Sequence, residues 1–132
     1  MRHLNRVKKL GRSKAHRELM IINQVKTLLR YGTLKTTKAK LKVAVSRADS
    51  LLSKVMSKDE KVAIRIVEKN LKDKEFAKFV VKDLKGKLPD KQSGFFNIYK
   101  LDFRKGDNAD MALAKLIFKK NKKDENKTNK KK

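Results

Sequence analysis

The sequence predicts an α+β fold with about four helices, a short early strand and a C-terminal antiparallel hairpin. From residue 15 to residue 88, apolar side chains recur every three or four positions, which is the period of a helix buried on one side. Residues 95–118 instead contain two apolar segments on either side of the polar cluster KGDNAD, an arrangement typical of a hairpin. We therefore expect a globular domain at residues 15–118, between a basic arm at 1–14 and a disordered lysine-rich tail at 119–132.

The first helix is expected to run from Ala15 to Tyr31. Ser13 stands where an N-cap belongs, because its side-chain oxygen can accept hydrogen bonds from the first turn. Gly32 stands where the chain must leave the helix with a positive φ. The apolar residues that share one face of this helix are Ala15, Leu19, Ile22, Val25 and Leu29.

A short strand and a second helix follow. Thr33–Thr36 is rich in β-branched residues and comes directly after a glycine, which favours a strand. Thr37 can then cap a second helix, whose apolar stripe runs from Leu41 to Val55. Lysines near the start of this helix oppose its dipole, which is reasonable if an anion binds there.

Two further helices are predicted before the hairpin. Ser57–Glu60 has the spacing of a capping box and is expected to start the third helix. Asp73 is expected to cap the fourth, which Gly86 and Pro89 end. The aromatic residues of the fourth helix are spaced for core packing rather than for stacking on bases.

The hairpin is predicted from two segments, Phe95–Arg104 and Met111–Phe118. The first is rich in Phe, Tyr and Ile and contains no glycine or proline, which favours a strand. Its alternation places Tyr99 on one face and Ile98 on the other. The turn between the segments is expected to present a basic tip at Arg104 and Lys105.

Charge is the strongest guide to function. The 132-residue chain has 38 Lys and Arg against 14 Asp and Glu, a formal net charge of +24, which opposes compaction unless a polyanion is near. Nucleic acid is the expected polyanion. A membrane surface is the alternative, but basic residues run through the whole chain rather than gathering in one amphipathic segment. We expect no membrane partner, and neither a secretory signal nor a membrane span, because no long apolar run is present.

Sequence motifs for catalysis are lacking. The chain has no cysteine, only two histidines, and no phosphate-binding loop, nucleophile elbow or zinc-binding spacing. The acidic pairs Asp59–Glu60 and Asp107–Asp110 are explained by a helix cap and a turn. We expect no enzyme, no cofactor, no metal and no small-molecule substrate. A DNA-packaging or regulatory protein stays open as an alternative, although the strand-like TLKTT disfavours a helix-turn-helix.

Candidate nucleic-acid contacts come from four regions: the arm, the start of the first helix, the start of the second helix, and the hairpin tip. For any single lysine, a merely solvated side chain is an equally good interpretation, and His16 alone would be an ordinary surface histidine. The candidates are Arg2, His3, Arg6, Lys8, Lys9, Arg12, Lys14, His16, Arg17, Lys35, Lys38, Lys40, Lys42, Arg104 and Lys105.

Several of these residues lie in motifs that resemble a known family, ribosomal protein seventeen of the bacterial large subunit. The N-terminal motifs are Met1-Arg2-His3, Leu10-Gly-Arg12, His16-Arg17 and Leu34-Lys35-Thr36-Thr37. The C-terminal motif is Phe103-Arg-Lys-Gly-Asp-Asn-Ala-Asp-Met-Ala112. The resemblance covers residues 1–118 in order, while residues 54–88 match in helical pattern more than in identity.

The resemblance implies helices packed against a three-stranded sheet. It also implies a non-catalytic role in the cytoplasm, binding large-subunit ribosomal RNA near the exit of the nascent-peptide tunnel. Other large-subunit proteins, notably number thirty-two, are the partners it implies. Such binding would recognise RNA shape, because the deep major groove of A-form RNA hides base edges.

Overall fold

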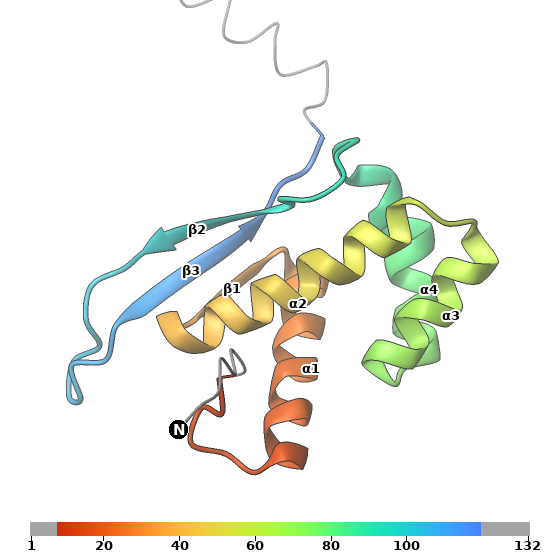
Figure 1. Cartoon of the computed structure of the whole chain (residues 1–132). Helices are drawn as coiled ribbons and strands as arrows, with labels where there is room; N and C mark the ends of the chain where they lie inside the picture. Colours follow the sequence, from red (N-terminus) through yellow and green to blue (C-terminus); the bar gives the residue numbers. More distant parts are fainter. Residues whose placement is uncertain (1–7, 120–132) are drawn as a thin grey trace, which may run out of the picture.

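The computed structural model describes residues 8–119 of the chain and confirms the predicted α+β class (Figure 1). Helices and strands occur in the expected order, and the three strands form one sheet. The elements are α1 (Lys14–Tyr31), β1 (Thr33–Thr37), α2 (Lys38–Met56), α3 (Glu60–Leu71), α4 (Lys74–Phe79), a π-helical turn (Val80–Leu84), a 3-10 turn (Lys85–Lys87), β2 (Phe96–Lys100) and β3 (Met111–Leu116).

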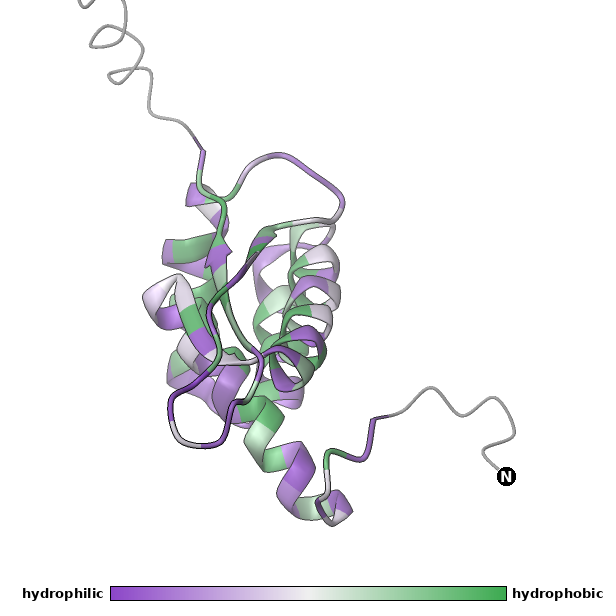
Figure 2. Ribbon diagram, turned by 90° about the vertical axis from the view of Figure 1, so that its left-hand side faces the viewer, coloured by the Kyte–Doolittle hydropathy of each residue, from purple (hydrophilic) through white to green (hydrophobic). Residues whose placement is uncertain are grey.

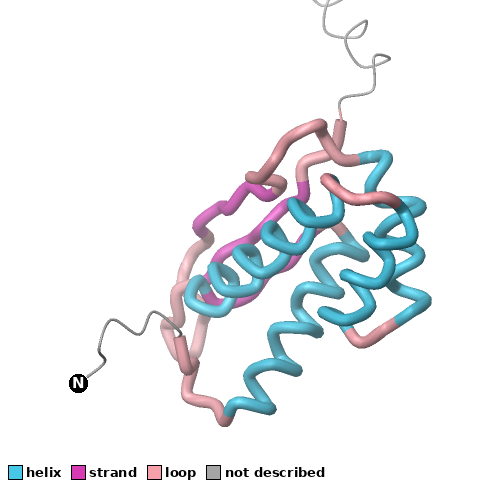
Figure 3. Tube along the Cα trace, turned by 45° about the vertical axis from the view of Figure 1, so that its right-hand side comes forward, coloured by secondary structure: helices cyan, strands magenta, loops and turns pink. Residues whose placement is uncertain are grey.

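The sheet is fully antiparallel, with strand order β1-β3-β2. The C-terminal strand β3 therefore lies between its hairpin partner β2 and the early strand β1. Leu113 of β3 pairs with Lys35 of β1 on one side and with Tyr99 of β2 on the other. In Figure 3, α2 lies across the sheet, so residues 38–56 cover β2 and β3, which come much later in the sequence.

The hydrophobic core lies between one face of this sheet and the helices. On β3, Ala112 and Ala114 face inward and are buried, while Lys115 between Ala114 and Leu116 is exposed, as expected for alternating strand residues. Phe95, just before β2, is the largest fully buried side chain. The core cluster also draws on α1, α2, α3 and the turns after α4.

The first half of α1 corrects one expectation. The predicted apolar face holds at Val25 and Leu29, which are buried. Leu19, however, is 55% exposed and Ala15 is also exposed. Figure 1 shows the reason, since the N-terminal half of α1 projects past the sheet and the other helices.

Three other boundaries differ from the sequence prediction. The N-cap of α3 is Asp59 rather than Ser57, whose hydroxyl instead donates to the carbonyl of Lys54 at 3.2 Å. The fourth helix becomes a π-helical turn after Phe79. The first hairpin strand ends at Lys100, because residues 101–110 form an extended loop in which only isolated backbone hydrogen bonds join the two sides.

The predicted cap of the fourth helix is confirmed. The Asp73 carboxylate accepts a hydrogen bond from the backbone N–H of Phe76 at 3.0 Å, and Lys26 of α1 donates to its other oxygen at 2.9 Å. These two hydrogen bonds lower the pKa of Asp73. The cap therefore also ties α1 to α4.

Candidate nucleic-acid interface

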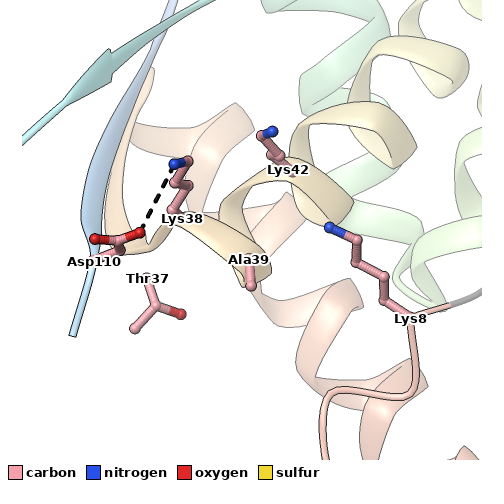
Figure 4. Close-up of a pocket in the computed structure, with 6 residues that line it drawn as sticks. All are labelled: Lys8, Thr37, Lys38, Ala39, Lys42 and Asp110. Carbon is pink, nitrogen blue, oxygen red and sulfur yellow. Dashed lines mark ion pairs between the residues drawn. The ribbon is translucent and has the colours of Figure 1, made fainter.

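A basic recess forms where the arm meets the start of α2 (Figure 4). It encloses about 380 Å³ and is lined by Lys8, Thr37, Lys38, Ala39, Lys42 and Asp110. Lys8 comes from the arm and Asp110 from the end of the hairpin loop, so three separate parts of the chain meet here. The Lys38 ammonium lies 3.8 Å from the Asp110 carboxylate. Three lysines against one carboxylate leave the recess positively charged.

The N-terminus of α2 adds to this positive charge. Thr37 is the N-cap, as predicted, but its side chain makes no capping hydrogen bond, and the first turn contains no acidic residue. The N–H groups at the start of a helix and the helix dipole both favour an anion. A phosphate group is a suitable ligand for this end of the helix, with lysine ammonium groups beside it.

Two arginines predicted to contact RNA, Arg12 and Arg17, also form hydrogen bonds with the backbone of the arm. Leu10 and Gly11 both have positive φ, and this turn folds the arm back toward α1. Arg12 donates to the carbonyl of Leu10 at 2.9 Å, and Arg17 donates to the carbonyl of Arg12 at 3.1 Å. Both side chains are half-buried. We conclude that these guanidinium groups first stabilise the shape of the arm.

The hairpin tip is held by an ion pair between Arg104 and Asp107. Arg104 Nε donates to Asp107 Oδ1 at 2.9 Å, and Nη2 donates to Oδ2, so the pairing is bidentate. It lowers the pKa of Asp107 to about 2 and raises that of Arg104. Arg104 keeps unused N–H groups on the other edge of its guanidinium and stays half-exposed. Lys105 beside it is exposed at the turn.

The predicted contacts that the structure describes gather at one end of the molecule. Figure 1 places residues 8–13, the start of α2 and the hairpin loop on the same side, away from α3 and α4. Figure 2, with the sheet toward the viewer, shows that hydrophilic residues dominate the hairpin loop. Among the candidates outside the recess, the exposed ones include Lys9, Lys14, His16 and Lys35, while Lys40 is half-buried. Arg2, His3, Arg6 and residues 120–132 of the predicted tail lie outside the described residues.

Sequence reasoning missed Asp110 as part of this site. Its turn-cluster context suggested only a structural role. The register of β1 and β3 would have predicted the contact. Thr37 pairs with Met111, and this pairing places Lys38 beside Asp110. The backbone confirms the contact, since Lys38 N–H donates to the carbonyl of Asp110 at 2.9 Å.

Two other kinds of site find no support in the part of the chain from residue 8 to residue 119. No group of three or more His, Asp or Glu residues there could hold a metal ion. No helix in that range is both long and apolar enough to cross a bilayer.

The fold and this surface define a small, strongly basic α+β protein whose cationic side chains surround a helix N-terminus and a hairpin. The chain belongs to the ribosomal protein L17 family, whose profile matches residues 20–117. It is 37% identical to large ribosomal subunit protein bL17 of Rubrobacter xylanophilus, over 89% of this chain and 96% of that protein. It is 35% identical to the bL17 protein of Chlorobium limicola and 34% identical to that of Phocaeicola vulgatus, again over 89% of this chain and over 77% and 72% of those proteins.

Proposed function

We propose that this chain is a structural constituent of the large ribosomal subunit that binds folded ribosomal RNA, in the cytoplasm and without catalysis. The observation that carries the proposal is the basic recess, where Lys8, Lys38 and Lys42 surround a helix start that lacks an acidic first turn. The relatives, which are large ribosomal subunit proteins bL17, support the same assignment.

The mechanism we propose is electrostatic and depends on shape. Each lysine or arginine that neutralises a phosphate releases counterions, so binding strengthens as salt falls. The lysines of the recess would neutralise neighbouring phosphates of one RNA segment, and the hairpin tip with Arg104 and Lys105 would reach another segment. Residues 1–14 act as a basic arm that contacts phosphate, because arginine can bind phosphate oxygens with two N–H groups and lysine supplies a point charge.

The finer location rests on the terminal motifs that resemble the family. We propose a position near the exit of the nascent-peptide tunnel, with ribosomal protein thirty-two as a neighbour. Cross-linking of the full chain on intact ribosomes tests both statements, since cross-links to RNA and proteins far from the tunnel exit would disprove the position.

Sedimentation tests the main proposal. The tagged full chain should comigrate with large subunits in a lysate gradient and stay bound at moderate salt. In a separate competition, large-subunit RNA should displace duplex DNA from the purified chain. Equal affinity for the two polymers, together with absence from the large-subunit fractions, would favour a DNA-packaging protein instead.

A further inference from the structure

The face of the sheet that points away from the helices is uncovered in residues 8–119. On β3, the residues that face the helices are buried, whereas Lys115 is exposed. The strand register places the partners of Lys115 on the same face. Two neighbouring rows of this outer face are Thr33, Lys115 and Asn97, and Lys35, Leu113 and Tyr99.

The outer face combines an aromatic ring with positive charge. Tyr99 is 47% exposed, and the Lys115 ammonium lies 5.8 Å from the centre of its ring. Lys35 is also exposed, one strand further across. None of the three strands contains an aspartate or a glutamate. A polyanion therefore complements the charge of this face better than a protein surface without acidic residues would.

We propose that the outer sheet face binds an unpaired segment of RNA, with one base stacked on Tyr99 and phosphates near Lys35 and Lys115. Open sheets that carry aromatic residues recognise single-stranded RNA in this way, because every base offers a π-face. The Asn97 amide can donate to or accept from a base edge in the adjacent row. This inference rests on the proposed function and extends it, from phosphate contacts at the recess to a base contact on the sheet.

Tyrosine fluorescence provides a direct test, because the chain has no tryptophan and only two tyrosines. The variant Tyr31→Phe leaves Tyr99 as the only tyrosine, and the variant Tyr99→Phe leaves Tyr31. The probe is a short unstructured RNA with an end label whose anisotropy reports binding. Stacking should quench the tyrosine fluorescence of the Tyr31→Phe protein when the probe binds. The tyrosine fluorescence of the Tyr99→Phe protein should stay unchanged. A blunt RNA duplex should bind without this quenching.

Affinity gives an independent readout. Tyr99→Ala should weaken binding of the single-stranded probe about tenfold, while Tyr99→Phe retains a stacking ring and binds normally. Tyr31→Ala is the matched control, because Tyr31 is 71% exposed at the end of α1 and should not affect affinity. Circular dichroism of each variant verifies the fold. The fluorescence experiment does not use the alanine variant, so it stands even if that variant fails to fold.

The possible failures can be told apart. If the probe binds but Tyr99 fluorescence and Tyr99→Ala affinity stay unchanged, the sheet-face proposal is wrong and the recess still accounts for RNA binding. If Tyr99 responds only to added large-subunit proteins, the face is a protein contact and the proposal is equally wrong. If the wild-type chain binds no RNA of either kind, the proposed function itself fails.

Discussion

The carboxylate of Asp49, in the middle of α2, accepts a hydrogen bond from the backbone N–H of Phe95, with 2.8 Å between Oδ1 and N. The same oxygen lies 2.9 Å from the nitrogen of Gly94. Phe95 is completely buried and β2 begins at the next residue. This contact therefore fixes the point at which the chain leaves the polar loop and enters the sheet.

Asp49→Ala should destabilise the protein by about 1–3 kcal/mol, because it removes a charged acceptor from two backbone N–H groups. Asp49→Asn keeps one carbonyl oxygen and should cost less. Denaturant unfolding followed by circular dichroism measures the difference. Asp59→Ala is the control, since the exposed Asp59 side chain makes no capping bond and its loss should change stability by no more than about 0.5 kcal/mol. Equal losses in both variants would contradict the role of Asp49.

The contrast between Asp73 and Asp49 explains how much of the fold the sequence could predict. Asp73 caps a helix that begins at the next residue, so its capping partner, the N–H of Phe76, is local and the pattern alone indicates it. The partners of Asp49 are 45 and 46 residues away, and no local pattern connects them. Strand order has the same difficulty, because pairing of β1 with β3 depends on packing across the whole chain.

The candidate site shows a similar division. Charge and spacing indicated Lys38 and Lys42 near a helix start, and the structure places them in one recess with Lys8. The same reasoning predicted Arg12 and Arg17 as RNA contacts but did not predict their hydrogen bonds within the arm. Their guanidinium groups donate to arm carbonyls, which depends on the positive φ values at Leu10 and Gly11 rather than on residue type.

Gly32→Ala should destabilise the protein by about 1–2 kcal/mol. Gly32 ends α1 with a φ of 70°, a conformation that costs a residue with a Cβ about this much. The new Cβ would also lie 3.4 Å from the ring of Phe118. Thermal unfolding measures the effect. Gly86→Ala is the matched control, because its φ lies outside the left-handed region and nothing is within 4 Å of an added Cβ, so stability should be unchanged or slightly higher.

The Arg104–Asp107 pair predicts how the hairpin tip responds to acid. Because pairing lowers the Asp107 pKa from 3.8 to about 2, it favours the ionised carboxylate of the folded tip. Its stabilising effect is therefore fully present above pH 3.8 and is lost as the pH falls through 2. NMR titration of the Asp107 carboxyl carbon should give this low midpoint.

Arg104→Gln should move that midpoint back toward 3.8, because the bidentate partner is lost. Lys105→Gln is the control, since it removes a neighbouring charge and leaves both hydrogen bonds intact. A midpoint that Lys105→Gln raises as far as Arg104→Gln would show that general positive charge, rather than the ion pair, lowers the Asp107 pKa.

The basic recess should be visible in the salt dependence of RNA binding. Each neutralised phosphate contributes roughly 0.7 to 0.9 to the slope of log affinity against log salt. Changing Lys8, Lys38 and Lys42 together to glutamine should therefore reduce the magnitude of the slope by roughly 2, measured with purified full chain and large-subunit RNA fragments.

The matched control changes the exposed Lys74, Lys78 and Lys87 to glutamine, which removes the same net charge around and after α4, on the far side of the molecule. Because salt screens surface charges beyond about 10 Å, the control should leave the slope nearly unchanged. Equal reductions in both proteins would mean that RNA responds to net charge alone and that the recess is no specific contact.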